Sequence, residues 1–343
     1  MPLRRRALLA VALMTLGSAL IAPPADAVQA RDRVPVLVRT YDVRDLLVRI
    51  PDFTDPPELG VAEPAARRKQ EPEPEGKARE TLLNQLVNLL SLREAPKVHD
   101  GQLVVGGTVS EHVEVAKTLA PLRERMATQV KVEARLELVG EAAMAEIAVT
   151  HPELARKLRV ASFNGGDRTG TLLTAEEAGR LKGDPVSTPH VTLFSGQRAY
   201  VLVAPLRAFV GDIVARKGNG GEEVFDPVAK EMQSGVVLDA QATAAPDGRT
   251  VALNARLQCC TLHGLREAAA PGFPPEKNLK VQVPDYEQQL VGINAVVPND
   301  VYLLFGCTET IRPNAPEGGE AKPQPLFAVV RVKVQRRQPA EVH

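Results

Sequence analysis

The side chains that could carry out chemistry stand far apart in this sequence. The six histidines are His99, His112, His151, His190, His263 and His343. No two of them have the i, i+4 spacing of a helical zinc site. Ser195 lies between two apolar runs, but a nucleophile elbow needs glycines two residues before and after the serine, and Leu193 and Gln197 stand there. We therefore predict that Ser195 is a turn residue and that the histidines bind no metal.

Two carboxylates, Glu133 and Glu137, alternate with Lys131 and Arg135 along one face of a predicted strand. An acid–base pair requires two carboxylates in a dry pocket that separates their pKa values. Alternating charges on a strand face instead indicate ion pairs between strands. The glycine-rich stretches 165–166 and 218–221 lack the Gly-Lys-Ser/Thr ending of a phosphate-binding loop. The sequence thus predicts no catalytic, cofactor-binding or metal-binding residue, no cofactor and no enzyme.

Composition narrows the class of protein further. A length of 343 residues indicates two domains of ordinary size, and a hydrophobic share of 44% is enough for a core. Aromatic residues make up only 3%, with no tryptophan, which argues against stacking on nucleic-acid bases. Lysine plus arginine and aspartate plus glutamate number 42 each, so net charge does not favour nucleic acid as a partner.

The first 27 residues have the pattern of a secretory signal peptide. Arg4-Arg5-Arg6 precedes an apolar run from Ala7 to Ala22, and Ala25-Asp26-Ala27 is a small-x-small cleavage site. A membrane anchor is the alternative, but the run is short. No later run reaches the roughly 18 apolar residues of a spanning helix. We expect an exported protein of the periplasm or outer membrane.

Export places the three cysteines in an oxidising compartment. Cys259 and Cys260 are neighbours on a predicted strand, so their side chains point to opposite faces. Cys259 shares its face with Val251 and Leu257 and is expected to be a small core residue. Cys307 follows another strand and could pair with either cysteine.

Residues 34–127 are expected to form a small α+β domain with the order β-α-β-β-α. A proline- and charge-rich segment, 51–76, is predicted to be a disordered insertion because it has too few apolar residues to order itself. The expected elements are a strand at Val36–Tyr41, a short helix capped by Asp42, a helix at Lys77–Leu92, a hairpin at Lys97–Gly107 and a helix to Met126. Either Thr108 or Ser110 caps the last helix, whose predicted buried residues are Val113, Ala116, Leu119 and Leu122.

Residues 128–336 are expected to form a mainly antiparallel β domain. The segment Gln129–Val139 alternates strictly, with Val132, Ala134, Leu136 and Leu138 on one face and charges on the other, which predicts a strand with one wet face. Helical stretches follow at Glu141–Leu158 and after the capping box at Thr174. Three hairpins are predicted, and they pair Val191–Phe194 with Tyr200–Val203, Val236–Thr243 with Thr250–Leu262, and Leu290–Val297 with Val301–Phe305. Leu326–Val334 is the last predicted strand.

The order of these strands and turns resembles the bacterial type II/III secretion secretins. The resemblance lies in Pro189–Val203 with its Ser-Gly turn, in Gly235–Leu253 with its Pro-Asp-Gly turn, and in the strand Val301–Gly306, where Cys307 replaces a second glycine. Leu103–Val113 is similar to the strand-turn-helix step of the ring-building domains that precede the pore domain. The resemblance implies a divergent secretin-like domain after one ring-building domain. Residues 205–290 carry charged stretches such as 216–223, from which we expect a trimmed scaffold without membrane-embedded hairpins.

The resemblance implies a non-enzymatic protein that forms a homo-oligomer or docks on other secretion-complex or envelope proteins, with outer-membrane association. The alternative is a periplasmic β-rich module that binds a ligand or peptide by strand addition. A hydrolase is a third class, and no cluster of residues supports it.

Overall fold

The computed structural model describes residues 35–48, 50–61, 75–90, 92, 94–163, 170–181, 183–312 and 322–336, without the side chains of 75–79, 162–163 and 307–310. The predicted signal peptide lies outside these residues. The helices are η2 (Arg44–Leu47), α1 (Glu75–Leu89), α2 (Val109–Ala127), α3 (Glu141–Thr150), α4 (Pro152–Phe163), α5 (Ala175–Arg180) and η3 (Pro275–Lys277).

Strands make up most of the fold. They are β1 (Leu37–Asp42), β2 (Gly60–Val61), β3 (Lys97–His99), β4 (Gln102–Gly107), β5 (Thr128–Leu138), β6 (Thr171–Leu173), β7 (Asp184–Ser187), β8 (His190–Phe194), β9 (Arg198–Val203), β10 (Leu206–Lys217), β11 (Glu223–Gln233), β12 (Gly235–Ala244), β13 (Thr250–Ala269), β14 (Lys280–Pro298), β15 (Tyr302–Ile311) and β16 (Gln324–Arg336). Every described strand pair is antiparallel. The predicted α+β class, dominated by antiparallel strands, is confirmed.

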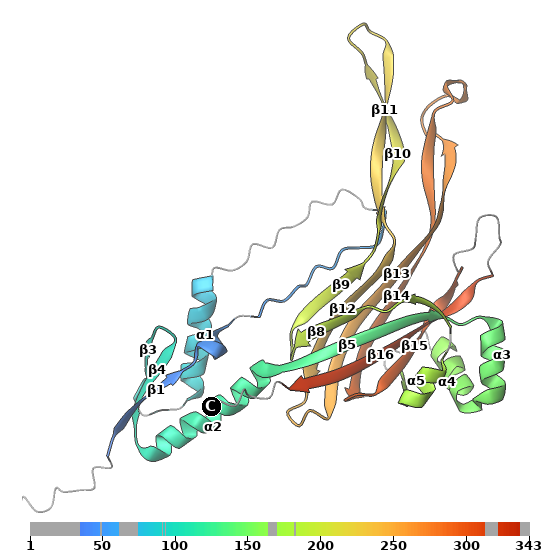
Figure 1. Cartoon of the computed structure of the whole chain (residues 1–343). Helices are drawn as coiled ribbons and strands as arrows, with labels where there is room; N and C mark the ends of the chain where they lie inside the picture. The colour runs from blue at the N-terminus through green and yellow to red at the C-terminus, as the bar shows by residue number, and fades with distance from the viewer. Residues whose placement is uncertain are drawn as a thin grey trace, which may run out of the picture.

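The N-terminal part is a three-stranded sheet in the order β1-β4-β3, packed against α1, α2 and η2 (Figure 1). The turn between β3 and β4 is made by Asp100 and Gly101, both at positive φ, as its sequence predicts. Thr108 caps α2 in a reciprocal capping box with Glu111. These features settle the predicted choice between Thr108 and Ser110.

The buried face of α2 differs from the prediction. Its buried residues are His112, Val115 and Leu119, whereas Val113 and Ala116 are exposed. The histidine is buried because both ring nitrogens have partners: Nδ1 lies 2.9 Å from Tyr41 Oη, and Nε2 lies 3.0 Å from the Leu37 carbonyl oxygen. A pattern of apolar residues alone cannot detect a polar residue that is satisfied inside a core.

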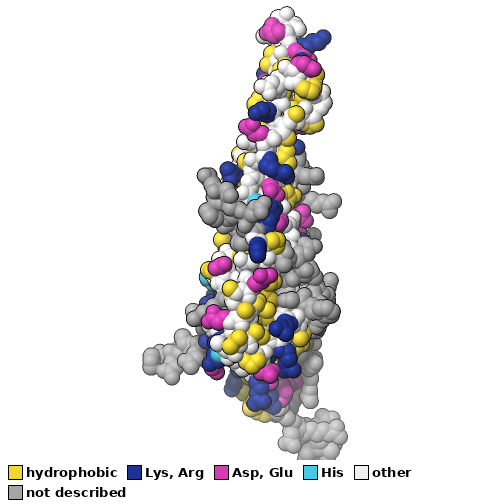
Figure 2. All heavy atoms as spheres, turned by 90° about the vertical axis from the view of Figure 1, so that its right-hand side faces the viewer, with side chains coloured by type: hydrophobic (Ala, Val, Ile, Leu, Met, Phe, Trp, Pro, Cys, Tyr) yellow, Lys and Arg dark blue, Asp and Glu magenta, His cyan; other side chains and the backbone are white. Residues whose placement is uncertain are grey.

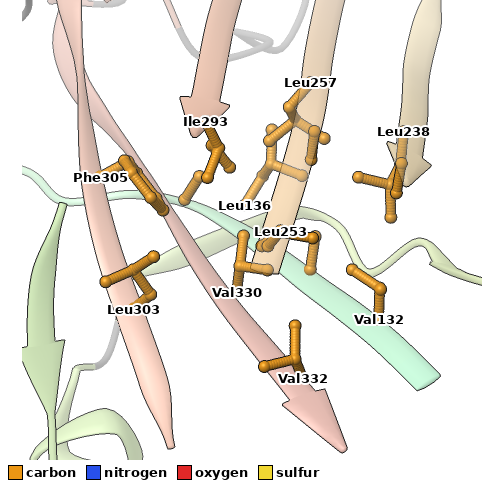
Figure 3. Packing of buried hydrophobic residues seen from close by; sticks show 14 of the residues in the cluster. Val132, Leu136, Leu238, Leu253, Leu257, Ile293, Leu303, Phe305, Val330 and Val332 are labelled. Carbon is orange, nitrogen blue, oxygen red and sulfur yellow. The ribbon is translucent and has the colours of Figure 1, made fainter. Parts of the chain in front are cut away.

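Two sheets face each other in the larger part of the molecule. One has the order β6-β15-β16-β5-β7, with β8 also paired to β5, and the other has the order β14-β13-β12-β9. The main core fills the space between them (Figure 3). Alternate residues of β5, such as Val132 and Leu136, point into it, as their period of two predicts. Cys259 is part of this core, as predicted.

The opposite face of β5 was predicted to be exposed to solvent, but it is half-buried. Helices α3, α4 and α5 pack on that side of the six-stranded sheet through a second core that includes Phe327 and Val329. Glu137 is buried there, and Arg135 donates to the Ala178 carbonyl at the end of α5. The helices cover charged side chains that the sequence pattern alone predicts to be exposed to solvent.

Two predicted hairpins are wrong. β8 pairs with β5 and β9 pairs with β12, so the turn at Ser195-Gly196 joins the two sheets rather than two neighbouring strands. Ser195 N donates to Thr128 O in one sheet, and Gly196 N donates to Ala242 O in the other. The turn after β14 does the same, because β14 pairs with β13 while β15 pairs with β16 and β6. Of the three hairpins predicted in residues 128–336, only the β12–β13 hairpin is confirmed.

Two long hairpins rise beyond the sheets, contrary to the expectation for residues 205–290. β10 and β11 form one, and the upper parts of β13 and β14 form the other (Figure 1). Each has a register shift, between Val210 and Asp212 and between Leu262 and Gly264. β-bulges of this kind increase local twist and change a strand's direction, and these lie where the hairpins leave the body of the protein.

The predicted disordered insertion does not hold for residues 51–61. This segment runs in extended form from η2 to the base of the β10–β11 hairpin, where β2 pairs with Met232 and Gln233 (Figure 1). Leu59 is buried there against Phe209 and Met232. Residues 62–74 of the predicted insertion lie outside the described part of the chain. The short helix that follows β1 has Val43 as its N-cap residue, one residue after the predicted Asp42, and Asp42 accepts a hydrogen bond from the Arg44 amide.

Candidate assembly surface

The four-stranded sheet ends in two edges that face outward. On one side the edge strand is β9, which continues into β10 after Ala204 and Pro205; on the other side it is β14. No described strand pairs with the outer side of β9 or of β14. We name these the β9 edge (residues 198–203) and the β14 edge (residues 288–298).

The two edges also run in opposite directions. Each neighbouring pair in the order β14-β13-β12-β9 is antiparallel, so β9 and β14 are antiparallel to one another. One row of register partners crosses the sheet through Val203, Val236, Cys259 and Gln289. The β14 edge of one copy could therefore add to the β9 edge of another as a further antiparallel strand. An open edge of unpaired N–H and C=O groups is a template for such pairing.

Exposed apolar residues lie along β14. Val283, Tyr286, Leu290 and Val296 are all exposed, the last two at 55% and 70%. Val203 at the end of β9 is 51% exposed. In the narrow side view of the molecule, apolar and charged side chains are interspersed along its height (Figure 2). Large apolar side chains beside an open sheet edge indicate a contact surface more than an isolated exposed residue does.

The two hairpins touch at their upper ends and near their bases. Phe225 on β11 and Phe273 in the β13–β14 loop pack edge to face, with ring centroids 5.5 Å apart. The Lys277 ammonium lies 4.5 Å from the Phe225 ring centroid and pairs with Glu223. Lower down, Val210 N donates to Gln282 Oε1 over 3.0 Å. These contacts hold the hairpins together through side chains rather than through a backbone ladder.

A second polar cluster fixes the base of the β13–β14 hairpin. The amide and Nε of Arg312 donate to Glu287, its Nη2 donates to Asp285, and His263 Nε2 lies 3.3 Å from Glu287 Oε2. Partial burial opposes ionisation of Glu287, but the bonds from Arg312 outweigh it and hold the pKa of this carboxyl below its ordinary value. The cluster surrounds the register shift at Leu262 and Gly264, and its role is to hold that bend.

The residues tested for chemistry are not brought together. Among the described residues, no group of three or more histidines, cysteines or acids has the geometry of a metal site. Ser195 Oγ accepts a bond from Ala244 N, as a turn residue does. Glu133 pairs with Lys131 at 2.5 Å and with Arg331 on the neighbouring strand at 3.7 Å, and Glu137 pairs with Arg135 at 2.7 Å. The carboxylates are thus engaged with cations, but only the pair of Glu133 with Arg331 joins two strands as the alternating pattern predicts, and the other two pairs lie within β5.

Burial also explains the cysteines. Cys259 and Cys260 are buried free thiols on opposite faces of β13. Burial raises the pKa of each thiol to about 11, which keeps it protonated and poorly nucleophilic at neutral pH. Because both are free, neither forms the disulfide with Cys307 that the sequence left open.

Sequence reasoning missed the two edges and the hairpins. The signal that could have found them is a pair of runs that contain β-branched and aromatic residues, 206–217 and 223–233, on both sides of the Gly218–Gly221 tip. Pro227 interrupts that pattern, and a proline inside a run argues against a strand unless it lies at an edge.

Among the described helices, none combines the length and hydrophobicity that crossing a bilayer requires.

No protein-family model matches the chain, and no curated protein matches it. The chain is similar to solved structures of secretins, at low identity. Aeromonas hydrophila ExeD aligns with a TM-score of 0.32 and 13% identity over 75% of this chain and 58% of its own. The type II secretin GspD of enteropathogenic Escherichia coli aligns with a TM-score of 0.36 and 12% identity over 76% and 85%. The β-barrel secretin domain of InvG from the Salmonella SPI-1 injectisome gives 0.32 and 12% over 90% of each chain.

Proposed function

We propose that this protein is an exported, non-enzymatic, secretin-like component of a cell-envelope secretion complex that assembles with copies of itself. The observation that carries the proposal is the pair of open, oppositely directed edges on one sheet, β9 and β14. Because the two edges differ, pairing them between copies is a head-to-tail contact. Such a contact repeats from copy to copy and closes into a ring when the rotation per copy divides a full turn.

The proposed ring also includes the two long hairpins. β10 follows β9 in the chain, and it contacts the upper part of β14 within the same protomer through Val210 N and Gln282 Oε1, so a ring formed by the sheets would carry the two hairpins of each copy together. Closure of a sheet into a barrel removes its edges altogether. We propose residues 34–127 as a ring-building-type domain and residues 128–336 as the secretin-like domain. Location in the periplasm or outer membrane, and contacts with other envelope proteins, are part of this proposal.

Cysteine cross-linking between copies tests the edge pairing directly. Two proteins are prepared in a background in which Cys259, Cys260 and Cys307 are alanine. One carries Leu202→Cys, and the other carries a single cysteine at Gln288, Leu290 or Gly292, which share a sheet face with Leu202 and lie near its register row. Mixing and mild oxidation are expected to give a covalent heterodimer for one of the three positions.

The matched control is Asn254→Cys, an exposed residue on the same face of the interior strand β13, which should form no heterodimer with Leu202→Cys. Equal yields from the edge positions and from Asn254→Cys contradict the proposal. A module that binds peptides by strand addition would remain monomeric, and an added edge-matching peptide would change its mass only by the mass of the peptide.

A further inference from the structure

We infer that residues 50–61, which we name the strap, regulate this assembly by occupying part of the β9 edge and the base of its hairpin in the free protomer. The inference rests on the proposed function. The strap leaves η2 of the small domain, crosses to β9, and ends at β2 beside β11 (Figure 1).

At its lower end the strap binds the β9 edge in the way a neighbouring strand would. Phe53 N donates to Arg198 O over 2.9 Å, and Arg198 N donates to Asp52 Oδ1 over 2.8 Å. Both backbone groups of Arg198 therefore point to the strap rather than to β12. In addition, Gln197 Nε2 donates to Pro51 O. A strand from another copy needs these same groups of Arg198 for its own ladder.

At its upper end the strap caps the base of the β10–β11 hairpin. Val61 is the register partner of Met232, and Gly60 is the partner of Gln233. Leu59 lies in a buried cluster with Phe209, Met232, Val237 and Cys260. The strap is thus fixed at the first residue of β9 and again at the end of β11, where the β10–β11 hairpin begins.

The composition of the strap makes it a weak competitor. Pro51, Pro56 and Pro57 have no N–H to donate, and the ladder of β2 is only two residues long. Asp52 and Asp55 lie near the Arg198 guanidinium, whose pKa is raised mainly by Asp239 and further by these two carboxylates. A strand as long as β14 offers many more backbone bonds than the strap. A strand from an incoming copy could therefore displace the strap. In a single copy, the strap still covers the β9 edge and prevents premature pairing.

The strap also connects the edge to the small domain. It follows η2, and Asp45 of η2 pairs with Arg123 of α2 over 2.9 Å. Docking of the small domain against its own copies in a ring would change the position of η2 and draw the strap away from Arg198. Exposure of the edge would then follow contact between the small domains, so that assembly proceeds in a fixed order.

Two kinds of variant test the strap. Phe53→Pro removes the N–H that reaches Arg198 O, while Phe53→Leu keeps it as the matched control. The lock variant places Val61→Cys opposite Met232→Cys, register partners in an antiparallel pair, in the background in which the native cysteines are alanine. The oligomeric fraction is measured by mass photometry and analytical ultracentrifugation over a range of protein concentrations, with circular dichroism to check folding.

We expect Phe53→Pro to lower the concentration at which half the protein assembles by about tenfold, and Phe53→Leu to leave it unchanged. The oxidised lock should stay monomeric at concentrations where the reduced form assembles. If the oxidised and reduced lock assemble alike while wild type assembles normally, the strap has no regulatory role and the edge proposal still stands. If Phe53→Pro assembles less well than wild type, the strap promotes assembly and the inference is overturned. If none of these proteins assembles, both the edge proposal and the strap fail.

Discussion

Arg198 and Asp239 form a two-pronged ion pair across β9 and β12, with Nε 3.1 Å from Oδ1 and Nη2 2.5 Å from Oδ2. The Asp239 side chain is only 3% exposed, whereas that of Arg198 is 42% exposed. The same arginine binds the strap through its backbone. The pair therefore fixes the first residue of the edge strand on which assembly depends.

Removing the arginine should leave a buried carboxylate without its cation. Breaking a fully buried pair costs about 3–5 kcal/mol. Because Arg198 is partly exposed to solvent, we expect Arg198→Met to lower the free energy of unfolding by about 2 kcal/mol. Urea denaturation, at concentrations at which the protein is monomeric, measures this loss of unfolding free energy. Arg207→Met, at an exposed position of β10, is the control, and Asp239→Asn combined with Arg198→Met should recover part of the loss. Equal stability of Arg198→Met and Arg207→Met contradicts this account.

The Tyr41 hydroxyl satisfies a buried histidine nitrogen in the small domain. Tyr41→Phe deletes that hydroxyl and leaves His112 Nδ1 without its partner at 2.9 Å. We expect the variant to lose about 1–2 kcal/mol of unfolding free energy, the usual effect of an unpaired buried polar atom. Tyr286→Phe, at an exposed position of β14, is the matched control and should change stability little. A loss in the control as large as that in Tyr41→Phe would show that the bond to His112 is not the cause.

The two neighbouring cysteines should be chemically silent in the folded protein. Their thiols are buried and have pKa values raised to about 11 by that burial. At pH 8 we expect negligible labelling of Cys259 and Cys260 by iodoacetamide over minutes, and complete labelling of both after denaturation under reducing conditions. Denaturation without reductant also counts disulfides. Three reactive thiols per chain indicate none, whereas one indicates that Cys307 pairs with one of the other two cysteines. Fast labelling of the native protein at Cys259 or Cys260 is incompatible with the packing described.

Glu137 makes stability depend on pH. Burial raises the pKa of its carboxyl above the ordinary value of 4.5, and neither Arg135 nor the Gly183 amide fully offsets that effect. The folded state thus holds this proton more tightly than the unfolded state. Its contribution to stability is greatest below the ordinary pKa and is lost as pH rises through the raised pKa of the folded state.

We therefore expect Glu137→Gln, which keeps an acceptor for Gly183 N, to be more stable than wild type at pH 7 by up to about 1 kcal/mol. The difference should vanish near pH 3. Thermal unfolding at both pH values checks this. Glu133→Gln, a half-buried neighbour on the same strand, loses ion pairs to Lys131 and Arg331 and should show no gain. A Glu137→Gln variant less stable at pH 7 than at pH 3, each relative to wild type, reverses the predicted sign.

Local sequence signals predicted most individual elements. Alternation predicted β5, the Asp100-Gly101 turn predicted the β3–β4 hairpin, and the capping box at Thr174 predicted a helix start, while Thr108 was one of two predicted caps for α2. These signals succeed because each depends on residues within a few positions of one another.

Features that depend on residues far apart in the sequence could not be predicted from local patterns. The turn at Ser195-Gly196 has the sequence of a hairpin turn, yet its amides bond to Thr128 and Ala242 in different sheets. The strap has the composition of a disordered segment, and its order comes from Arg198 and Met232, far along the chain. Open edges have no sequence signature, because an edge is defined by which strand is missing beside it.

The most direct test of the central claim is the mass of the mature protein, measured by native mass spectrometry with negative-stain electron microscopy of the same sample. Pairing of the β9 and β14 edges predicts one closed species with a fixed copy number and ring-shaped particles, in detergent or without it. A strict monomer at every concentration in both conditions, or an open ladder of masses with no preferred copy number, would contradict the account.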